Sequence, residues 1–192
     1  MAVKFVTGNI TKATTDAIVN AANSGLKKGG GVCGAIFNAV RDAGGSEAEY
    51  SLKEACNAIG HCSTGNAVIT PSFGLPAEHI IHAVGPIWSG NTNPLDRLDG
   101  GQNAHIKALA DTYRSIIRVC RENNLTSVTI PAISTGIYDF PEDLAAAIAV
   151  KICTEESGDI DVTLIGYNSD STLVLMNTPS PRAAILLSGV TL

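Results

Sequence analysis

Short apolar segments rich in β-branched residues alternate along the chain with longer stretches whose apolar residues recur at helical spacing. The short segments predict strands over 3–6, 16–20, 66–70, 79–84, 127–133 and 161–167. The longer stretches predict helices near 32–42, 46–59, 102–123 and 141–155. This alternation indicates an α/β domain with helices on both faces of a largely parallel or mixed sheet.

Two regions lie outside this alternation. Residues 85–103 are rich in turn-forming residues and predict a long surface connection rather than a domain boundary. The segment "NTPSPR" at 177–182 is expected to be extended, and the apolar end at 183–192 is expected to dock on the domain or on a partner. We therefore expect one domain over 1–176, followed by a C-terminal extension over 177–192.

Composition and charge exclude several classes of partner. The chain has 192 residues, of which 45% are hydrophobic and 16% charged, as in compact globular domains. Its formal net charge is -5 and no cluster of Lys and Arg forms a basic stripe, so long nucleic acid is not an expected partner. We find no secretory signal and no apolar stretch of the roughly 18 residues that a membrane span needs. We expect a cytoplasmic monomer that does not bind membranes.

Cysteine and histidine positions argue against a metal site. The five cysteines are Cys33, Cys56, Cys62, Cys120 and Cys153. Their odd number and the lack of a CxxC pair disfavour both a disulfide framework and a cysteine zinc site. His79 and His82 would point to opposite faces of a strand, and His61 beside Cys62 is no better as a ligand pair. We expect neither a metal nor a cofactor.

Three successive glycines, Gly29 to Gly31, precede the first predicted helix. With Gly34 they match GxGxxG, but the preceding strand is expected to end at Asn20, nine positions before Gly29, whereas the dinucleotide fingerprint begins directly after its strand. An NAD-dependent dehydrogenase is therefore only a secondary alternative. Glycine-rich backbone that enters a helix N-terminus suits a phosphate group. The other interpretation is a mobile surface loop.

A second segment repeats this arrangement. In "PAISTGIYDFPEDL" at 131–144, a buried strand leads to Ser134, Thr135 and Gly136, and a helix is expected to start near Pro141. If the strands are parallel, both turns lie at the carboxyl edge of one sheet, where open α/β folds bind ligands. Two anion-binding turns at one edge indicate a diphosphate.

Six motifs follow one another in a fixed order: "GNIT" at 8, "AIVNAANSGLKKGGGV" at 17, "TGNAVITPSFGLP" at 64, "IIHAVGP" at 80, "IPAISTGIYDFP" at 130 and "GYN" at 166. Together they resemble the macrodomain family, a module that binds ADP-ribose. The resemblance covers Lys4 to about Asn168. It implies a three-layer α/β/α macrodomain fold with a central mixed, largely parallel sheet and a cleft for ADP-ribose.

The resemblance also implies a role for each part of this cleft. Asn9 and Ile10 would lie at the adenine, with Tyr167 stacked on the ring and Asn168 nearby; many members have Asp where this chain has Asn9. Backbone N–H groups would wrap the diphosphate and part of the distal ribose. These groups belong to Gly29, Gly30, Gly31, Val32, Ser134, Thr135, Gly136, Ile137 and Tyr138.

Around the distal ribose, the resemblance implies that Asn23 bonds the hydroxyls, Phe140 covers the sugar and Asn20 braces the loop. Cys33 follows the glycines where hydrolysing members often carry Asp, although some viral macrodomains that are associated with hydrolysis have Cys there. Asp139 stands where Gly is common. Asn23, Cys33 and Asp139 are thus the catalytic candidates. As alternatives, Cys33 is a small helix residue and Asp139 a helix cap.

The resemblance implies an ADP-ribosyl-ester hydrolase that needs no metal. It would release ADP-ribose from mono-ADP-ribosylated acidic side chains or from O-acetyl-ADP-ribose. A module that reads ADP-ribosylated proteins without turning them over is the alternative. In both cases the expected partners are ADP-ribose and ADP-ribosylated proteins.

Overall fold

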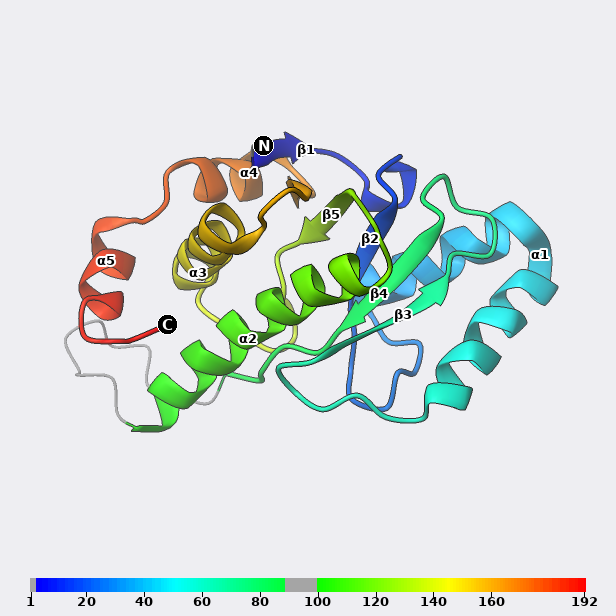
Figure 1. Cartoon of the computed structure of the whole chain (residues 1–192), viewed down its shortest axis with the longest axis horizontal. Coiled ribbons are helices and arrows are strands. Elements are labelled where there is room, and N and C mark those ends of the chain that lie inside the picture. The colour runs from blue at the N-terminus through cyan, green and yellow to red at the C-terminus, as the bar shows by residue number, and fades with distance from the viewer. Residues whose placement is uncertain (1–2, 89–99) are drawn as a thin grey trace.

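The computed structural model describes residues 3–88 and 100–192, and within them six strands form one sheet (Figure 1). The strands are β1 (Lys4–Thr7), β2 (Ala17–Ala21), β3 (Ala67–Pro71), β4 (His79–Ala83), β5 (Ser127–Pro131) and β6 (Asp161–Gly166). Their order in the sheet is β1-β6-β5-β2-β4-β3. All neighbouring pairs are parallel except β3 with β4. The predicted strands and the mixed, largely parallel sheet are confirmed.

The helices agree with the predicted pattern and add to it. They are α1 (Gly31–Ile59), α2 (Gly100–Glu122), α3 (Glu142–Glu156), α4 (Ser169–Met176), α5 (Pro181–Leu187) and a 3-10 turn, η1 (Ile10–Lys12). The two helices expected at 32–42 and 46–59 are the halves of α1, which breaks at Gly45, where φ is 76°. The sequence did not predict η1, α4 or α5. Most of the connection expected over 85–103 falls on 89–99, outside the described residues.

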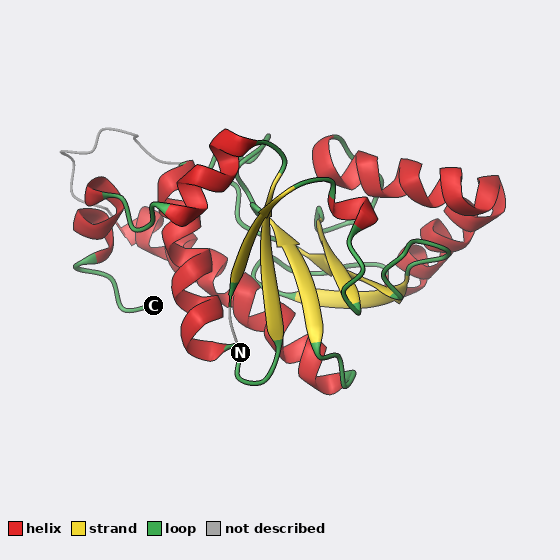
Figure 2. Ribbon diagram, turned by 90° about the horizontal axis from the view of Figure 1, so that it is seen from above, coloured by secondary structure: helices red, strands yellow, loops and turns green. Residues whose placement is uncertain are grey.

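The helices cover the sheet on both faces (Figures 1 and 2). Ile18 and Ile80 pack in one apolar cluster with α1, whereas the next residues along the same strands, Val19 and Ile81, pack in the other cluster with α2 and α3. Successive strand residues point to opposite faces, so a sheet covered on both sides needs continuous apolar runs. This explains the consecutive apolar residues of β2 and β4, such as Ile18 with Val19 and Ile80 with Ile81.

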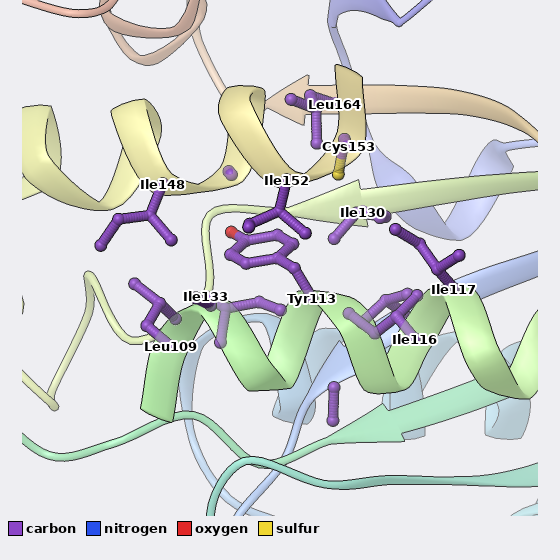
Figure 3. Packing of buried hydrophobic residues seen from close by; sticks show 14 of the residues in the cluster. Leu109, Tyr113, Ile116, Ile117, Ile130, Ile133, Ile148, Ile152, Cys153 and Leu164 are labelled. Atoms are coloured by element: carbon purple, nitrogen blue, oxygen red, sulfur yellow. The ribbon is translucent and has the colours of Figure 1, made fainter. Parts of the chain in front are cut away.

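The larger cluster lies between the sheet, α2 and α3. Figure 3 shows the ring of Tyr113, from α2, directed toward Ile152 of α3, with Ile130 and Ile133 alongside. Tyr113 is 1% exposed. Its burial raises the pKa of the phenol, which therefore stays protonated.

The end of the chain packs against α3. Ser180 accepts a hydrogen bond from the Ala183 backbone N–H at 3.1 Å and donates one to Asp143 at 2.9 Å. The Ala183 side chain is fully buried. The expectation of an extended segment is wrong for its last two residues, because Ser180 acts as an N-cap and Pro181 is preset for the first helical turn. The division of the chain at residue 176 stays a prediction.

Candidate ligand-binding cleft

A cleft with a volume of about 910 Å³ lies at the carboxyl edge of the sheet. It is lined by segments that follow β1, β2, β4, β5 and β6, and by the start of α1. These five strands are parallel, so their carboxyl ends meet at one edge. Ligand pockets range over about 300–1,000 Å³, so the cleft has room for a nucleotide-sized molecule.

Most residues predicted as ligand contacts line this cleft. They come from the ends of β1 and β6, from the first turn (residues 23–31) with the start of α1, and from the second turn (residues 132–138). These residues are Asn9, Ile10, Asn23, Gly29, Gly30, Gly31, Val32, Cys33, Ser134, Thr135, Gly136, Ile137, Tyr138 and Tyr167. The fold thus brings together both predicted turns. The role of each residue in binding stays a prediction.

Two glycines in the turns face space that no other part of the protein occupies. A Cβ atom at Gly30 or Gly136 would meet no atom within 4 Å beyond its chain neighbours. At Gly31 a φ of 57° favours glycine, but Gly30 has a φ of -87°, which any residue adopts. Folding therefore does not require glycine at Gly30, and at Gly136 there is room for a side chain. A ligand that lies directly against the backbone would require glycine at both positions.

Two further glycines are explained by close packing. A Cβ atom at Gly34 would lie 2.7 Å from the carbonyl oxygen of Gly29, and one at Gly85 would lie 2.6 Å from Cγ2 of Ile133. Gly34 lets the first turn fold back onto α1. Gly85 lets the end of β4 approach the second turn. Gly85 lies in the wall of the cleft, whereas Gly34 lies outside it.

Side-chain hydrogen bonds hold the first turn. The Asn23 amide donates from Nδ2 to the Lys27 carbonyl at 2.7 Å and accepts from the Lys27 N–H at 3.0 Å. The Cys33 thiol accepts from the N–H of Gly29 at 3.4 Å and from Asn20 Nδ2 at 3.6 Å, and donates to the Lys27 carbonyl at 3.7 Å. None of these partners is a base that would activate a nucleophile. The geometry makes Cys33 a brace of the turn.

A buried histidine supports this brace through Asn20. His82 Nδ1 lies 3.1 Å from Asn20 Nδ2, and Nε2 lies 2.9 Å from Thr70 Oγ1. An amide N–H only donates, so Nδ1 accepts and Nε2 carries the proton of the neutral ring. The Thr70 hydroxyl donates to the Pro71 carbonyl at 3.0 Å and is thus free to accept from Nε2. Burial lowers the pKa of His82 to about 4, which keeps the ring neutral near pH 7.

Backbone hydrogen bonds and aromatic packing hold the second turn. The N–H of Trp88 donates to the Tyr138 carbonyl at 2.8 Å, and the N–H of Phe140 donates to the Ser134 carbonyl at 2.9 Å. The rings of Trp88 and Phe140 meet edge to face, with centroids 4.7 Å apart. Ser134 itself has a φ of 66°, and its buried hydroxyl has no hydrogen-bond partner among the described residues. That hydroxyl packs against the backbone of Gly85.

Four predicted site residues do not line the cleft: Asn20, Asp139, Phe140 and Asn168. Asn20 is 1% exposed and holds Cys33, in keeping with the predicted bracing role. Phe140 is 2% exposed because its ring packs on Trp88 in the core. The expected contacts of Phe140 with the distal ribose stay a prediction.

The other two residues lie at helix starts. Asn168 caps α4, accepting from the N–H of Ser171 at 2.8 Å. Asp139 has a φ of 54° and precedes α3, but the N-cap position of α3 is Pro141, which makes no side-chain cap hydrogen bond. The alternative interpretation of Asp139 as a cap is therefore wrong, because the helix starts two residues too late for its carboxylate.

Where the adenine is expected, the cleft is lined by the polar side chain of Asn9 and the aromatic ring of Tyr167. The side-chain Oδ1 of Asn9 accepts from the N–H and the hydroxyl of Thr11, at 3.0 and 2.8 Å, so this side chain caps η1. Tyr167, and Ile137 in the second turn, line the cleft with 82% and 90% of their surface exposed. Large apolar side chains exposed at a concave site mark a surface that a ligand covers.

Sequence reasoning missed several residues of the cleft wall, among them Gly85, Glu142, Ser171 and Leu175. Ser171 and Leu175 lie on α4, which was not predicted. Gly85 follows a predicted strand, and Glu142 lies in the first turn of a predicted helix, so both could have been found from the rule that ligands bind at carboxyl ends. Among the described lining residues, Glu142 is the one carboxylate.

Comparison with known proteins agrees with this geometry. The family model described as "Macro domain" matches residues 19–149. A protein of Shigella flexneri named O-acetyl-ADP-ribose deacetylase is 43% identical over 157 residues, which are 80% of this chain and 79% of that protein. A macro domain-containing protein of Lactiplantibacillus plantarum is 44% identical over 149 residues, covering 78% and 76%.

Solved structures show the same similarity. A mutant Oceanobacillus iheyensis macrodomain with ADPR superposes with a TM-score of 0.73 at 35% identity, covering 90% of this chain and 88% of that one. The Trypanosoma brucei macrodomain in complex with ADP-ribose has a TM-score of 0.71 at 30% identity, covering 91% and 68%. The chain belongs to the macrodomain family, and its fold is the α/β macrodomain fold.

Two further properties concern membrane-spanning helices and metal-binding groups among the described residues. Among the described residues, none of the helices combines the length and the apolar character needed to cross a membrane. Within the same residues, no group of three or more His, Cys, Asp or Glu side chains is placed to hold a metal ion.

Proposed function

We propose that this protein binds ADP-ribose in the cleft and hydrolyses the ester that joins ADP-ribose to an acidic side chain or to acetate. One observation carries the binding part. Gly30 and Gly136, on two turns far apart in sequence, face the same cleft without any need imposed by folding. A diphosphate that lies against both backbones would require both glycines.

The proposed orientation of the ligand rests on the residues that line the two ends of the cleft. The exposed ring of Tyr167 supplies a stacking surface for adenine beside Asn9 and Ile10. The start of α1 and its preceding glycines supply N–H groups and a helix dipole for the diphosphate. Asn23 and Cys33 then lie toward the distal ribose. The structural neighbours solved with ADPR and with ADP-ribose support this class of ligand.

For hydrolysis, a water molecule adds to the ester carbonyl and the ribose oxygen leaves with a proton. The products are a free carboxylic acid and ADP-ribose. Positioning and N–H groups that stabilise negative charge would supply most of the rate enhancement. The hydrogen bonds of the Cys33 thiol argue against a covalent intermediate on sulfur. The name of the Shigella flexneri relative supports this reaction class.

A non-catalytic reader of ADP-ribosylated proteins is the second candidate. The observation that favours it is the lining of the cleft, where Cys33 stands at the start of α1 and Glu142 is the one carboxylate among the described lining residues. A reader needs the same affinity for ADP-ribose and no turnover.

Two measurements decide between these candidates. Calorimetric titration with ADP-ribose should give a saturable binding curve, and NAD should bind more weakly. Incubation with O-acetyl-ADP-ribose and with an auto-mono-ADP-ribosylated protein should release ADP-ribose over minutes to hours. Binding without release would select the reader, and the absence of binding would reject both.

A further inference from the structure

A nearly buried carboxylate in the second half of α1 contacts a cation in the first half. Glu49, in the second half, has 3% of its side chain exposed and contacts three cations. Lys28 Nζ lies 2.9 Å from Oε1, Lys53 Nζ lies 3.1 Å from the same oxygen, and Arg41 Nε contacts Oε2. The hydrogen bond from Lys28, followed by that from Lys53, lowers the pKa of Glu49 to about 2. The carboxylate is therefore ionised throughout the physiological range.

The three cations come from different parts of the chain. Arg41 and Lys53 lie on α1 itself, one in each half. Lys28 lies in the first turn, immediately before Gly29, and its Nζ also donates to Asn38 Oδ1 at 2.7 Å. Lys28 thus bonds side chains in both halves of α1. These bonds connect the first turn to α1, whose N-terminus opens into the cleft.

The contacts of Lys28 hold a segment whose backbone loses much conformational entropy when it becomes ordered. Three glycines follow Lys28, and glycine loses more backbone entropy on ordering than any other residue. A loop that is ordered before binding loses less entropy when the ligand arrives. An ion pair to a carboxylate that is 3% exposed is also less screened than a surface pair.

We infer that the Lys28–Glu49 ion pair is a positioning device that orders the glycine turn for a diphosphate ligand. This inference rests on the proposed function for the identity of the ligand, but not for the ordering of the turn. Neither side chain lines the cleft. Both act through the backbone of Gly29 to Gly31.

The competing explanation is direct attraction between the cations and the diphosphate. Under that explanation, removing any of the cations weakens binding, and neutralising Glu49 strengthens it. Under the positioning explanation, Lys28→Met and Glu49→Gln both weaken binding, while Lys53→Met does not. Lys53→Met is the matched control, because Lys53 contacts the same carboxylate oxygen but does not belong to the turn.

The test combines two readouts on the full chain. NMR backbone order parameters of Gly29 to Gly31 should fall in Lys28→Met and in Glu49→Gln, whereas those of the second turn stay unchanged. The dissociation constant for ADP-ribose should rise three- to tenfold in both variants and stay within twofold in Lys53→Met. Lys28→Arg should restore both readouts, and the double variant should be no weaker than the weaker single variant.

The outcomes distinguish the positioning role of the ion pair from the identity of the ligand. Unchanged order parameters in Lys28→Met would overturn the positioning role, whatever the affinity. Tighter binding by Glu49→Gln would overturn it in favour of direct attraction. Reduced order together with a wild-type protein that does not bind ADP-ribose would overturn the diphosphate assignment and the proposed function, while supporting the positioning role itself.

Discussion

The two turns that line the cleft are held in different ways. In the first turn, the Asn23 amide and the Cys33 thiol bond the backbone, and the Lys28 ammonium bonds the side chains of Glu49 and Asn38 on α1. In the second turn, the backbone bonds itself and the neighbouring segment, while Phe140 and Trp88 pack beneath it. One turn depends on electrostatics and hydrogen bonds, and the other on the apolar core.

This difference has consequences for what each turn tolerates. Neutralising a polar contact of the first turn should loosen the turn while leaving the domain folded. Disturbing the packing below the second turn should cost global stability, because its supports belong to the main core. Stability and ligand affinity should therefore respond independently to substitutions in the two turns.

The largest expected effect is that of Phe140→Ala. Phe140 is 2% exposed and packs edge to face on Trp88, so its removal should lower the free energy of unfolding by about 3–5 kcal/mol. Urea denaturation measures this loss. A cost below about 1 kcal/mol would show that the second turn does not depend on the core.

Next in size is the effect of Gly136→Val on ligand binding. A Cβ atom at Gly136 meets no atom of the fold within 4 Å beyond its chain neighbours, and the valine side chain would occupy the cleft, so ADP-ribose affinity should fall at least about tenfold with little change in stability. Gly189→Val is a suitable control, because that glycine is equally free of neighbours and lies outside the cleft. Equal affinities of the two variants would contradict the assigned diphosphate position.

A smaller effect concerns pH. Burial lowers the folded-state pKa of His82 from 6.5 to about 4, so the unfolded chain binds a proton first as the pH falls. Stability should be highest above pH 6.5 and should decrease by about 1.5 kcal/mol between pH 6.5 and pH 5. His82→Gln should remove most of this slope in urea titrations at the two pH values. An unchanged slope would mean that other groups cause it.

The smallest expected effect is that of Cys33→Ala. Thiol hydrogen bonds are weak, so ADP-ribose affinity should fall only about two- to fivefold. Any turnover of O-acetyl-ADP-ribose should persist, because the thiol braces the turn and attacks nothing. Loss of turnover with unchanged affinity would instead make Cys33 catalytic, and Cys33→Ser would then be the informative comparison.

Much of this architecture could be predicted from the pattern of residues. The six strands, α2, α3 and the two halves of α1 correspond to segments that the spacing of apolar residues predicted. Both glycine turns were also predicted, because each lies between a predicted strand and a predicted helix. Helix α4 was missed because its sequence, "SDSTLVLM", has no amphipathic period, and α5 because its seven residues were too few to show one.

The supports of the cleft could not be predicted in the same way. Asn20 and His82 are 62 positions apart, and Lys28 and Glu49 are 21 apart. Nothing local in the sequence marks these residues as partners, because their distances depend on how β2 pairs with β4 and on how α1 bends at Gly45. For the same reason, the packing of Phe140 on Trp88 could not be predicted.

By itself, the sequence determined the order of strands and helices, the glycines of both turns and the family resemblance, since these depend on spacing and on residue types over short ranges. Only the tertiary structure decided which side chains hold the turns, which of them reach the cleft, and that a carboxylate on α1 ties the glycines in place. Such contacts join residues that parallel strand pairing and helix packing bring together, and local patterns carry no record of them.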